Sequence, residues 1–268
     1  MPKLDKISFH NLHHSRNIGL LSEEEQRIID SSRLLIAGCG VGSQIALSAA
    51  RVGFENFLIV DGDKVEISNI NRQGYSWRDE GRYKVDALSR KIKSINPHAS
   101  IKKFPLFVGI DNADKLVKNS DIIIDAIDPF SAIAIIALHR AARKYKKSVI
   151  IPVDTGWGAA IIIYTPSSIS YDESIGINPK TFIGDIDENE AFNKVATHLL
   201  SILPEYAKKI AIDAAYNKNI HYPQPITAVN IISALTVDAA KRLALKQPTV
   251  SAPNFVSFDP DIALSTVK

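Results

Sequence analysis

The sequence contains a single cysteine, Cys39, among its 268 residues. One cysteine cannot form a disulfide within the chain, and it cannot supply the several thiolates of a cysteine-rich zinc site. Cys39 also lies inside a glycine-rich turn, where a nucleophile would collide with a bound phosphate. We therefore interpret it as a small filler side chain rather than a catalytic one.

An excess of charge of one sign is also missing. The chain has 32 Lys and Arg against 29 Asp and Glu, a net charge of +3, which favours neither nucleic acid nor a membrane surface as a partner. It has no run of 18 apolar residues and no secretory signal pattern. With 46% hydrophobic residues it has material for a sizeable core. We expect a soluble, cytoplasmic protein.

Three histidines, His10, His13 and His14, lie close together near the N-terminus. Their spacing suggests a metal, but the sequence offers no fourth ligand and no residues that would orient the rings. We therefore expect a surface or interface segment and no bound zinc.

A glycine-rich turn lies between a predicted strand and a predicted helix. The apolar run 34–37 predicts a buried parallel strand, residues 43–52 have helical spacing, and a second predicted strand at 57–60 ends in Asp61. In nucleotide-binding folds, glycines let the backbone approach a phosphate at a helix N-terminus. An acid about 20 residues further on reaches a ribose hydroxyl. The turn departs from the dinucleotide fingerprint, because Ser43 stands where the third glycine is expected.

The polar segment after Asp61 is more specific than the turn. Asn69, Arg72 and Gln73 follow the acid by 8, 11 and 12 residues, and Lys84 comes a further 11 residues on. Arginine and lysine supply fixed positive charge, which hydride transfer does not need. Stabilising a reacting triphosphate does need it.

Strand and helix patterns then alternate, which predicts a doubly wound, mostly parallel, Rossmann-like α/β sheet with a C-terminal extension. Polar residues 167–190 show no period and predict a functional or mobile loop. The last predicted helix, 227–245, is apolar on several faces, which suits deep burial or an interface. We expect one domain over residues 1–268, made of a helical segment (1–33), a nucleotide-binding core (34–155) and a substrate and dimer half (156–268).

These motifs resemble the ThiF/MoeB/HesA family, the bacterial relatives of ubiquitin-activating enzymes. The resemblance covers roughly residues 16–155 and is carried by Gly38, Gly40, Gly42, Ser43, Asp61, Asp63, Ser68, Asn69, Arg72, Gln73, Lys84, Asn96, Pro97, Asp125 and Asp128. It implies ATP-dependent adenylation of a C-terminal carboxylate, on a small ubiquitin-fold or sulfur-carrier protein or on a peptide. It also implies a homodimer.

Matched position by position, the resemblance implies that the glycine turn cradles phosphates, that Asp61 holds the ribose and that Asp128 binds Mg²⁺. In family homodimers an N-terminal arginine commonly reaches the partner's ATP, and Arg16 sits where that residue is expected. The expected catalytic residues are Arg16, Arg72, Lys84 and Asp128. The expected nucleotide-binding residues are Gly38, Gly40, Gly42, Asp61, Asp63, Asn69 and Gln73.

Two features common in the family are missing. The chain has no paired Cys-x-x-Cys zinc ligands, and Cys39 is badly placed to form a thioester or persulfide after adenylation. Three alternatives stay open. They are a tRNA-nucleoside cyclising dehydratase of the same family, an NAD-binding Rossmann oxidoreductase, and a catalytically silent dimeric scaffold.

Overall fold

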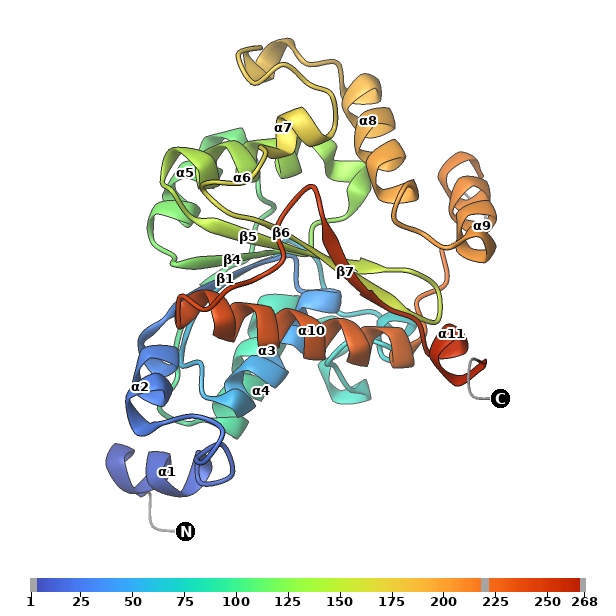
Figure 1. Ribbon diagram of the computed structural model, residues 1–268. Helices are drawn as coiled ribbons and strands as arrows, with labels where there is room; N and C mark the ends of the chain where they lie inside the picture. Colours follow the sequence, from blue (N-terminus) through green and yellow to red (C-terminus); the bar gives the residue numbers. More distant parts are fainter. Residues whose placement is uncertain (1–3, 218–221, 266–268) are drawn as a thin grey trace.

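The computed structural model describes residues 4–217 and 222–265, and within them one seven-stranded sheet forms the centre of the fold (Figure 1). The strand order is β3-β2-β1-β4-β5-β6-β7. The first five strands are parallel, whereas β6 and β7 run antiparallel to their neighbours. The strands are β1 (Arg33–Ala37), β2 (Asn56–Val60), β3 (Ser100–Phe104), β4 (Ile122–Asp125), β5 (Ser148–Asp154), β6 (Ala159–Tyr164) and β7 (Phe255–Phe258).

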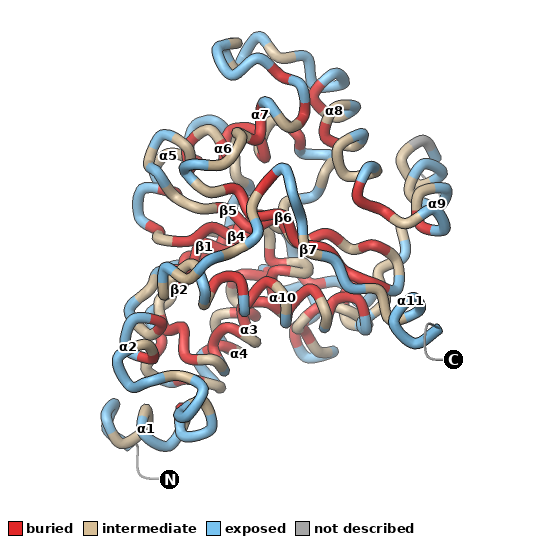
Figure 2. The backbone as a smooth tube through the Cα atoms, viewed as in Figure 1, coloured by how far each residue is buried: buried red, intermediate tan, exposed pale blue. Residues whose placement is uncertain are grey.

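Helices cover both faces of the sheet, and each face has its own apolar core (Figure 2). In β1, Leu35 and Ala37 belong to one core while Leu34 and Ile36 belong to the other, because successive side chains of a strand point to opposite faces. One face carries α3 (Val41–Val52), α4 (Lys84–Ile95) and α10 (Ile226–Ala244). The other carries α5 (Ile110–Lys118), α6 (Ala132–Lys144) and α8 (Glu188–Leu200). The predicted doubly wound, mostly parallel α/β fold is confirmed.

The last long helix, α10, is buried in its own chain. It packs on β4, β5 and β6 and on α3, with Val229, Ile232 and Val237 in the core. The sequence suited either deep burial or a subunit interface for this helix, and the structure shows deep burial. The helix therefore gives no support to a subunit interface.

The segment 167–190 is more regular than its sequence indicates. It contains α7 (Tyr171–Ser174) and a 3-10 turn, η4 (Ile183–Asp185). Two arginines of α6 hold it: Arg140 contacts Asp172 and the carbonyl of Thr181, and Arg143 donates to the carbonyls of Ser168 and of Pro166 just before the segment. These long-range contacts leave no periodic pattern in the sequence. Its mobility stays a prediction.

The other helices and strands lie close to where the sequence predicts them, except near the ends of the chain. A break near Pro204 separates α8 from α9 (Glu205–Tyr216). The edge strand β7 and the short helix α11 (Pro260–Ser265) were not predicted. No helix of the described residues has the length and hydropathy needed to cross a membrane. The division into three segments stays a prediction.

The N-terminal helices α1 (Lys6–His13) and α2 (Glu23–Ser31) lie at one end of the molecule (Figure 1). Ser22 begins α2 with a capping box, in which Glu25 is its partner. Helix α1 has no buried residue, so it contributes nothing to the apolar cores. His14, which directly follows it, is nevertheless buried, and the prediction of a surface segment is wrong at this residue.

Candidate nucleotide site

The candidate site lies where the strand order reverses. From β1 the chain crosses to β2 and β3 on one side, and then to β4 and β5 on the other. The strands end together, because Ala37 of β1 is paired with Val60 of β2 and with Asp125 of β4. Open α/β sheets bind ligands beyond the carboxyl ends of their strands at such a point.

The glycine turn after β1 packs too tightly for side chains. Gly38 has φ +90°, and a Cβ added there would lie 2.2 Å from the carbonyl oxygen of Ala126, which is backbone and cannot move aside. A Cβ on Gly42 would lie 2.8 Å from Ile36. Gly40 is the N-cap residue of α3 and has no side chain to cover the N–H groups of the first turn. The three glycines thus form a tight turn at a helix N-terminus, and this geometry suits a bound anion.

Asp61, at the end of β2, is built into this turn. Its Oδ2 accepts from the backbone N–H of Cys39 at 2.7 Å, and its Oδ1 accepts from the N–H of Asp63 at 2.8 Å. Burial raises the pKa of Asp61, while Lys84 and the two N–H groups act in the opposite direction. The carboxylate therefore fixes the shape of the loop as well as facing the site.

Lys84 opens α4 and points back toward the carboxyl end of β2. Its side chain is 10% exposed, and its Nζ lies 2.8 Å from Asp63 and 4.0 Å from Asp61. The Asp63 side chain is 55% exposed. The structure thus brings together the predicted glycines, Asp61, Asp63 and Lys84, and holds one cation close to the N-terminus of α3.

Supporting residues that the sequence interpretation missed tie the polar segment to the turn. Ser43 Oγ donates to the carbonyl of Gly40 and accepts from the N–H of Gly74 at 2.8 Å. Tyr75 OH donates to the carbonyl of Cys39 at 2.7 Å. The serine that breaks the dinucleotide fingerprint therefore connects the two motifs, although nothing in its sequence position indicated this.

The two amides of the polar segment have different neighbours. Asn69 ends the 3-10 turn η1 (Ile67–Asn69), and its Oδ1 accepts from the N–H of Glu66. Gln73 is buried beside Gly40, and its Oε1 has no hydrogen-bond partner among the described residues. Asn69 thus shapes the segment, and Gln73 is the amide that lies against the glycine turn.

Arg72 lies beside a carboxylate that was not predicted for the site, Asp154 at the end of β5. Arg72 donates from Nε to Gln224 and from Nη1 to the carbonyl of Ser68, both at 2.8 Å. Burial raises the pKa of Asp154 to about 7, partly offset by the N–H of Gly156 and by Arg72. Its Oδ2 is buried and accepts no hydrogen bond from the described residues. The sequence feature that could have indicated Asp154 as a site residue was its place at the end of a strand.

Asp128 lies in the loop after β4. It caps the 3-10 turn η3 (Pro129–Ser131), where its Oδ1 accepts from the N–H of Phe130 at 3.0 Å. The residue is exposed, so its carboxylate is open to a ligand. A single open carboxylate suits Mg²⁺, which commonly binds one or two carboxylates together with substrate phosphates.

Arg16 does not join the other predicted residues. Asn17 next to it donates to the carbonyl of Val52, which places this segment at the C-terminal end of α3. The glycine turn is at the N-terminal end, and a helix of 12 residues is about 18 Å long. That distance exceeds the reach of an arginine side chain, so the exposed Arg16 does not contact the site of its own chain.

Cys39 is fully buried within the turn. Burial raises the pKa of its thiol well above the ordinary value, and the nearby Asp61 raises it further. A thiolate is the reactive form, so this environment suits a packing role.

Comparison with known proteins agrees with this geometry. The model of the ThiF family matches residues 14–260. The chain therefore belongs to the ThiF family.

Curated relatives share only part of their length with it. The chain is 34% identical over 103 residues to the adenylyltransferase and sulfurtransferase UBA4 of Scheffersomyces stipitis, covering 38% of this chain and 23% of that protein. It is 31% identical over 121 residues to the SAMP-activating enzyme E1 of Haloferax volcanii, covering 44% and 45%. The matched region thus spans less than half of each relative.

Solved structures share the fold at low sequence identity. PaaA gives a TM-score of 0.68 at 23% identity, over 96% of this chain and 84% of that one. The structure of Escherichia coli MccB with ATP gives 0.65 at 19%, over 88% and 63%. The E. coli tRNA N6-threonylcarbamoyladenosine dehydratase TcdA gives 0.62 at 18%, over 88% and 95%.

Proposed function

We propose that this protein is an ATP-dependent adenylyltransferase that activates the C-terminal carboxylate of a small ubiquitin-like carrier protein or a peptide. The names of its relatives support the reaction class, since UBA4 is an adenylyltransferase and the archaeal relative is a SAMP-activating enzyme. Structures of MccB contain ATP in one case and the peptide MccA in another.

The observation that carries the proposal is the position of Lys84. A nearly buried ammonium group is held by Asp63 and faces Asp61 beside the N-terminus of α3. Because Asp63 is mostly exposed, an incoming phosphate can replace it on Lys84 without burying an unpaired charge. A dinucleotide site for hydride transfer has no use for such a cation, whereas a triphosphate does.

The chemistry requires alignment more than a protein nucleophile. The substrate carboxylate attacks the α-phosphorus of ATP, a new P–O bond forms, and the bond to the β-phosphate oxygen breaks so that pyrophosphate leaves with its negative charge. Lys84 and Arg72 would neutralise that charge, while the glycine turn would hold the phosphates through backbone N–H groups. No step uses Cys39, whose burial and raised pKa favour a mechanism without a protein thioester.

Mg²⁺ would be held by Asp128 together with the substrate phosphates. When bound, the ion supplies positive charge to the phosphate oxygens. The exposed carboxylate of Asp128, fixed by its hydrogen bond from Phe130, fits this task.

Arg16 would serve the active site of a second copy of the chain. Its position at the far end of α3 from the glycine turn leaves a neighbouring subunit as the site it would serve. A fixed cation delivered to a phosphoryl transition state contributes on the order of 10³-fold or more in rate. The homodimer is therefore part of this proposal.

A tRNA substrate is the second candidate, because the TcdA fold covers 88% of this chain. The net charge of +3 argues against it, since sequence-independent nucleic-acid binding depends on clustered basic residues. An NAD-dependent oxidoreductase has less support, because it leaves Lys84 and its two carboxylate neighbours without a task.

Pyrophosphate exchange tests the proposal. Radiolabelled pyrophosphate should be incorporated into ATP only when a suitable carrier protein or peptide is added, and addition of tRNA should give no exchange. Exchange with tRNA alone would favour the dehydratase.

Subunit mixing tests the role of Arg16. Arg16→Ala and Lys84→Ala should each be inactive, and mixed dimers should regain part of the activity, because one of their two sites has both residues. If mixed dimers form and no activity returns, Arg16 does not act across a dimer.

A further inference from the structure

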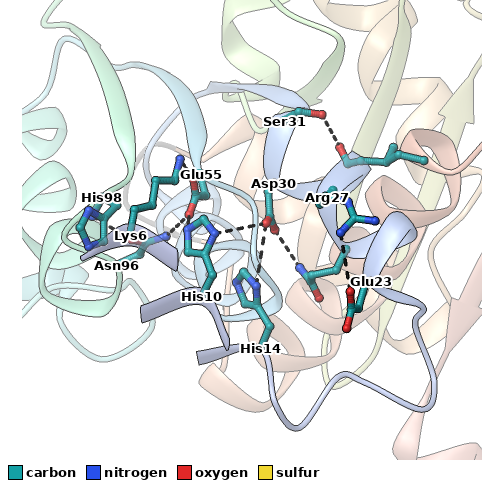
Figure 3. A network of polar contacts seen from close by, with 12 residues as sticks. Lys6, His10, His14, Glu23, Arg27, Asp30, Ser31, Glu55, Asn96 and His98 are labelled. Carbon is teal, nitrogen blue, oxygen red and sulfur yellow. Dashed lines mark hydrogen bonds and ion pairs between the residues drawn. The ribbon is translucent and has the colours of Figure 1, made fainter. Parts of the chain in front are cut away.

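A cluster of metal-binding side chains lies at the N-terminal corner of the molecule (Figure 3). The ligand atoms of His10, His14 and Asp30 all lie within 4.8 Å of one another. His10 comes from α1, His14 directly follows that helix, and Asp30 comes from α2. The sequence placed the histidines together but could not show that the fold brings a carboxylate to them.

His14 has no hydrogen-bond partner that explains its burial. Its side chain is 5% exposed, and its Nε2 is buried without a partner among the described residues. Its Nδ1 lies 3.9 Å from Asp30 Oδ2, which is too long for a hydrogen bond. The Nε2 lies by Gly53, so the nitrogen nearer Asp30, and available to a ligand there, is Nδ1.

The separations within the cluster suit a metal ion. His10 Nδ1 and His14 Nδ1 lie 3.7 Å and 3.9 Å from Asp30 Oδ2. Metal–ligand distances of about 2.0–2.2 Å place the ligands of a tetrahedral zinc ion about 3.3–3.6 Å apart. The atoms therefore stand slightly farther apart than a bound ion requires, and a small movement of the exposed helix α1 would close the difference.

Neighbouring residues orient the ligands in the way that metal sites require. The Nε2 of His10 is in contact with Glu55 Oε1, and Glu55 is itself held by Lys6 at 2.8 Å and by Asn96 at 2.9 Å. Metal-binding histidines almost always donate their second ring nitrogen to a carboxylate or carbonyl, and Glu55 places a carboxylate next to that nitrogen of His10. Gln26 similarly donates to the other oxygen of Asp30 at 2.9 Å.

From this geometry we propose that His10, His14 and Asp30 bind one zinc-like divalent transition-metal ion, with a water molecule as the fourth ligand. Two imidazoles and one carboxylate suit Zn²⁺, and imidazole favours it over Mg²⁺ or Ca²⁺.

The charge around these three side chains also suits a bound cation. Asp30 and Glu55 carry two negative charges, Lys6 offsets one of them through Glu55, and the remaining charge faces the ligand position. The alternative is a His10 ring that bridges the two carboxylates without any metal, and metal titration of the wild type tests it.

The ion would fasten α1 to the rest of the chain. This helix buries no residue, and Ile7 and Leu12 on it are 74% and 66% exposed, so apolar packing does not hold it. Ligands from both sides of the loop between α1 and α2 would fix that helix without an apolar core. The proposal revises the expectation of no zinc, which rested on the histidines having no partners.

The test uses the full-length chain with any affinity tag removed, and Co²⁺ and Zn²⁺ alone as probes. Wild type should bind one Co²⁺ per chain with the visible absorption of a tetrahedral site, and Zn²⁺ should displace it and raise the Tm. His14→Gln and Asp30→Asn should each weaken binding by roughly tenfold or more and remove the Tm shift.

His13→Gln is the matched control, because it removes an imidazole from the same helix without removing one of the three ligands. It should bind both ions like the wild type. If His14→Gln does not fold, Asp30→Asn carries the test, since its amide oxygen can still accept from Gln26. No binding by the wild type, or equal binding by the wild type, His14→Gln and Asp30→Asn, would overturn the proposal.

Discussion

The two ends of α3 use polar residues in opposite ways. At the N-terminal end, Asp61 accepts from two backbone N–H groups and Ser43 connects the turn to the polar segment. At the C-terminal end, the carbonyl of Val52 accepts from Asn17 and Gln26, while the Nε2 of His14 nearby has no hydrogen-bond partner among the described residues. A helix carries partial positive charge at its N-terminus and partial negative charge at its C-terminus. If both proposals hold, one helix presents an anion site at one end and a cation site at the other.

Substituting the glycines at the two ends should have unequal effects. Gly38→Ala places a methyl group 2.2 Å from a backbone oxygen, and we expect a loss of roughly 3–4 kcal/mol in the free energy of unfolding. Gly53→Ala meets the side-chain ends of Gln26, Asp30 and His14, which can move aside. The positive φ of residue 53 should still lower the free energy of unfolding of Gly53→Ala by about 1–2 kcal/mol.

Urea unfolding of both variants measures this difference. Gly81 is the control, since it also has positive φ but has nothing within 4 Å of an added Cβ. Gly81→Ala should therefore resemble Gly53→Ala rather than Gly38→Ala. Equal losses at Gly38 and Gly81 would mean that φ alone, and not the close packing of the turn, sets the cost.

Removing the exposed carboxylate of Asp128, near the N-terminal end of α3, should change how pyrophosphate exchange depends on the Mg²⁺ concentration. We expect Asp128→Ala to raise the Mg²⁺ concentration for half-maximal pyrophosphate exchange by roughly tenfold or more, because a ligand of the ion is lost. Asp114→Ala, which removes an exposed partner of Lys144 on the other face of the sheet, is the control and should leave the Mg²⁺ response unchanged. An unchanged response in Asp128→Ala would remove Asp128 from the metal site.

Asp154 adds a third case to this comparison. It is a buried carboxylate whose Oδ2 has no hydrogen-bond partner among the described residues. Its pKa is about 7 in the folded chain against an ordinary 3.8, so between these values the folded state keeps a proton that the unfolded state has released. Stability must then fall as pH rises through this window and become level above about 7. Asp154→Asn lacks the titration, so its Tm should rise relative to that of the wild type by a few degrees between pH 4 and 7. Parallel Tm curves would show that Asp154 titrates normally.

The sequence predicted the parts of the fold that depend on local pattern. Apolar runs and helical spacing located the strands and helices near the glycine turn, because both faces of a central parallel strand are buried. Edge strand β7, with exposed Phe255 and Phe258, has no such pattern and was missed.

Site residues were predictable where a motif required a residue type at a fixed spacing, as for Gly38, Asp61 and Lys84. They were not predictable where the contact depends on distant segments. Asp154 comes close enough to Arg72 for an electrostatic interaction only because β5 ends near the polar segment, and Asp30 comes close to His14 only because α2 folds back on α1. Neither pair has a spacing that a sequence pattern could reveal.

The most direct test of the central claim, a triphosphate site at the N-terminal end of α3, is calorimetric titration of the protein with MgATP and with NAD. We expect MgATP to bind and NAD to give no signal. Lys84→Ala should lose the roughly 1.5–3 kcal/mol of a hydrogen bond to a charged group, about tenfold or more in Kd. Binding of NAD with MgATP giving no signal, or MgATP binding unaffected by Lys84→Ala in a folded variant, would contradict the account.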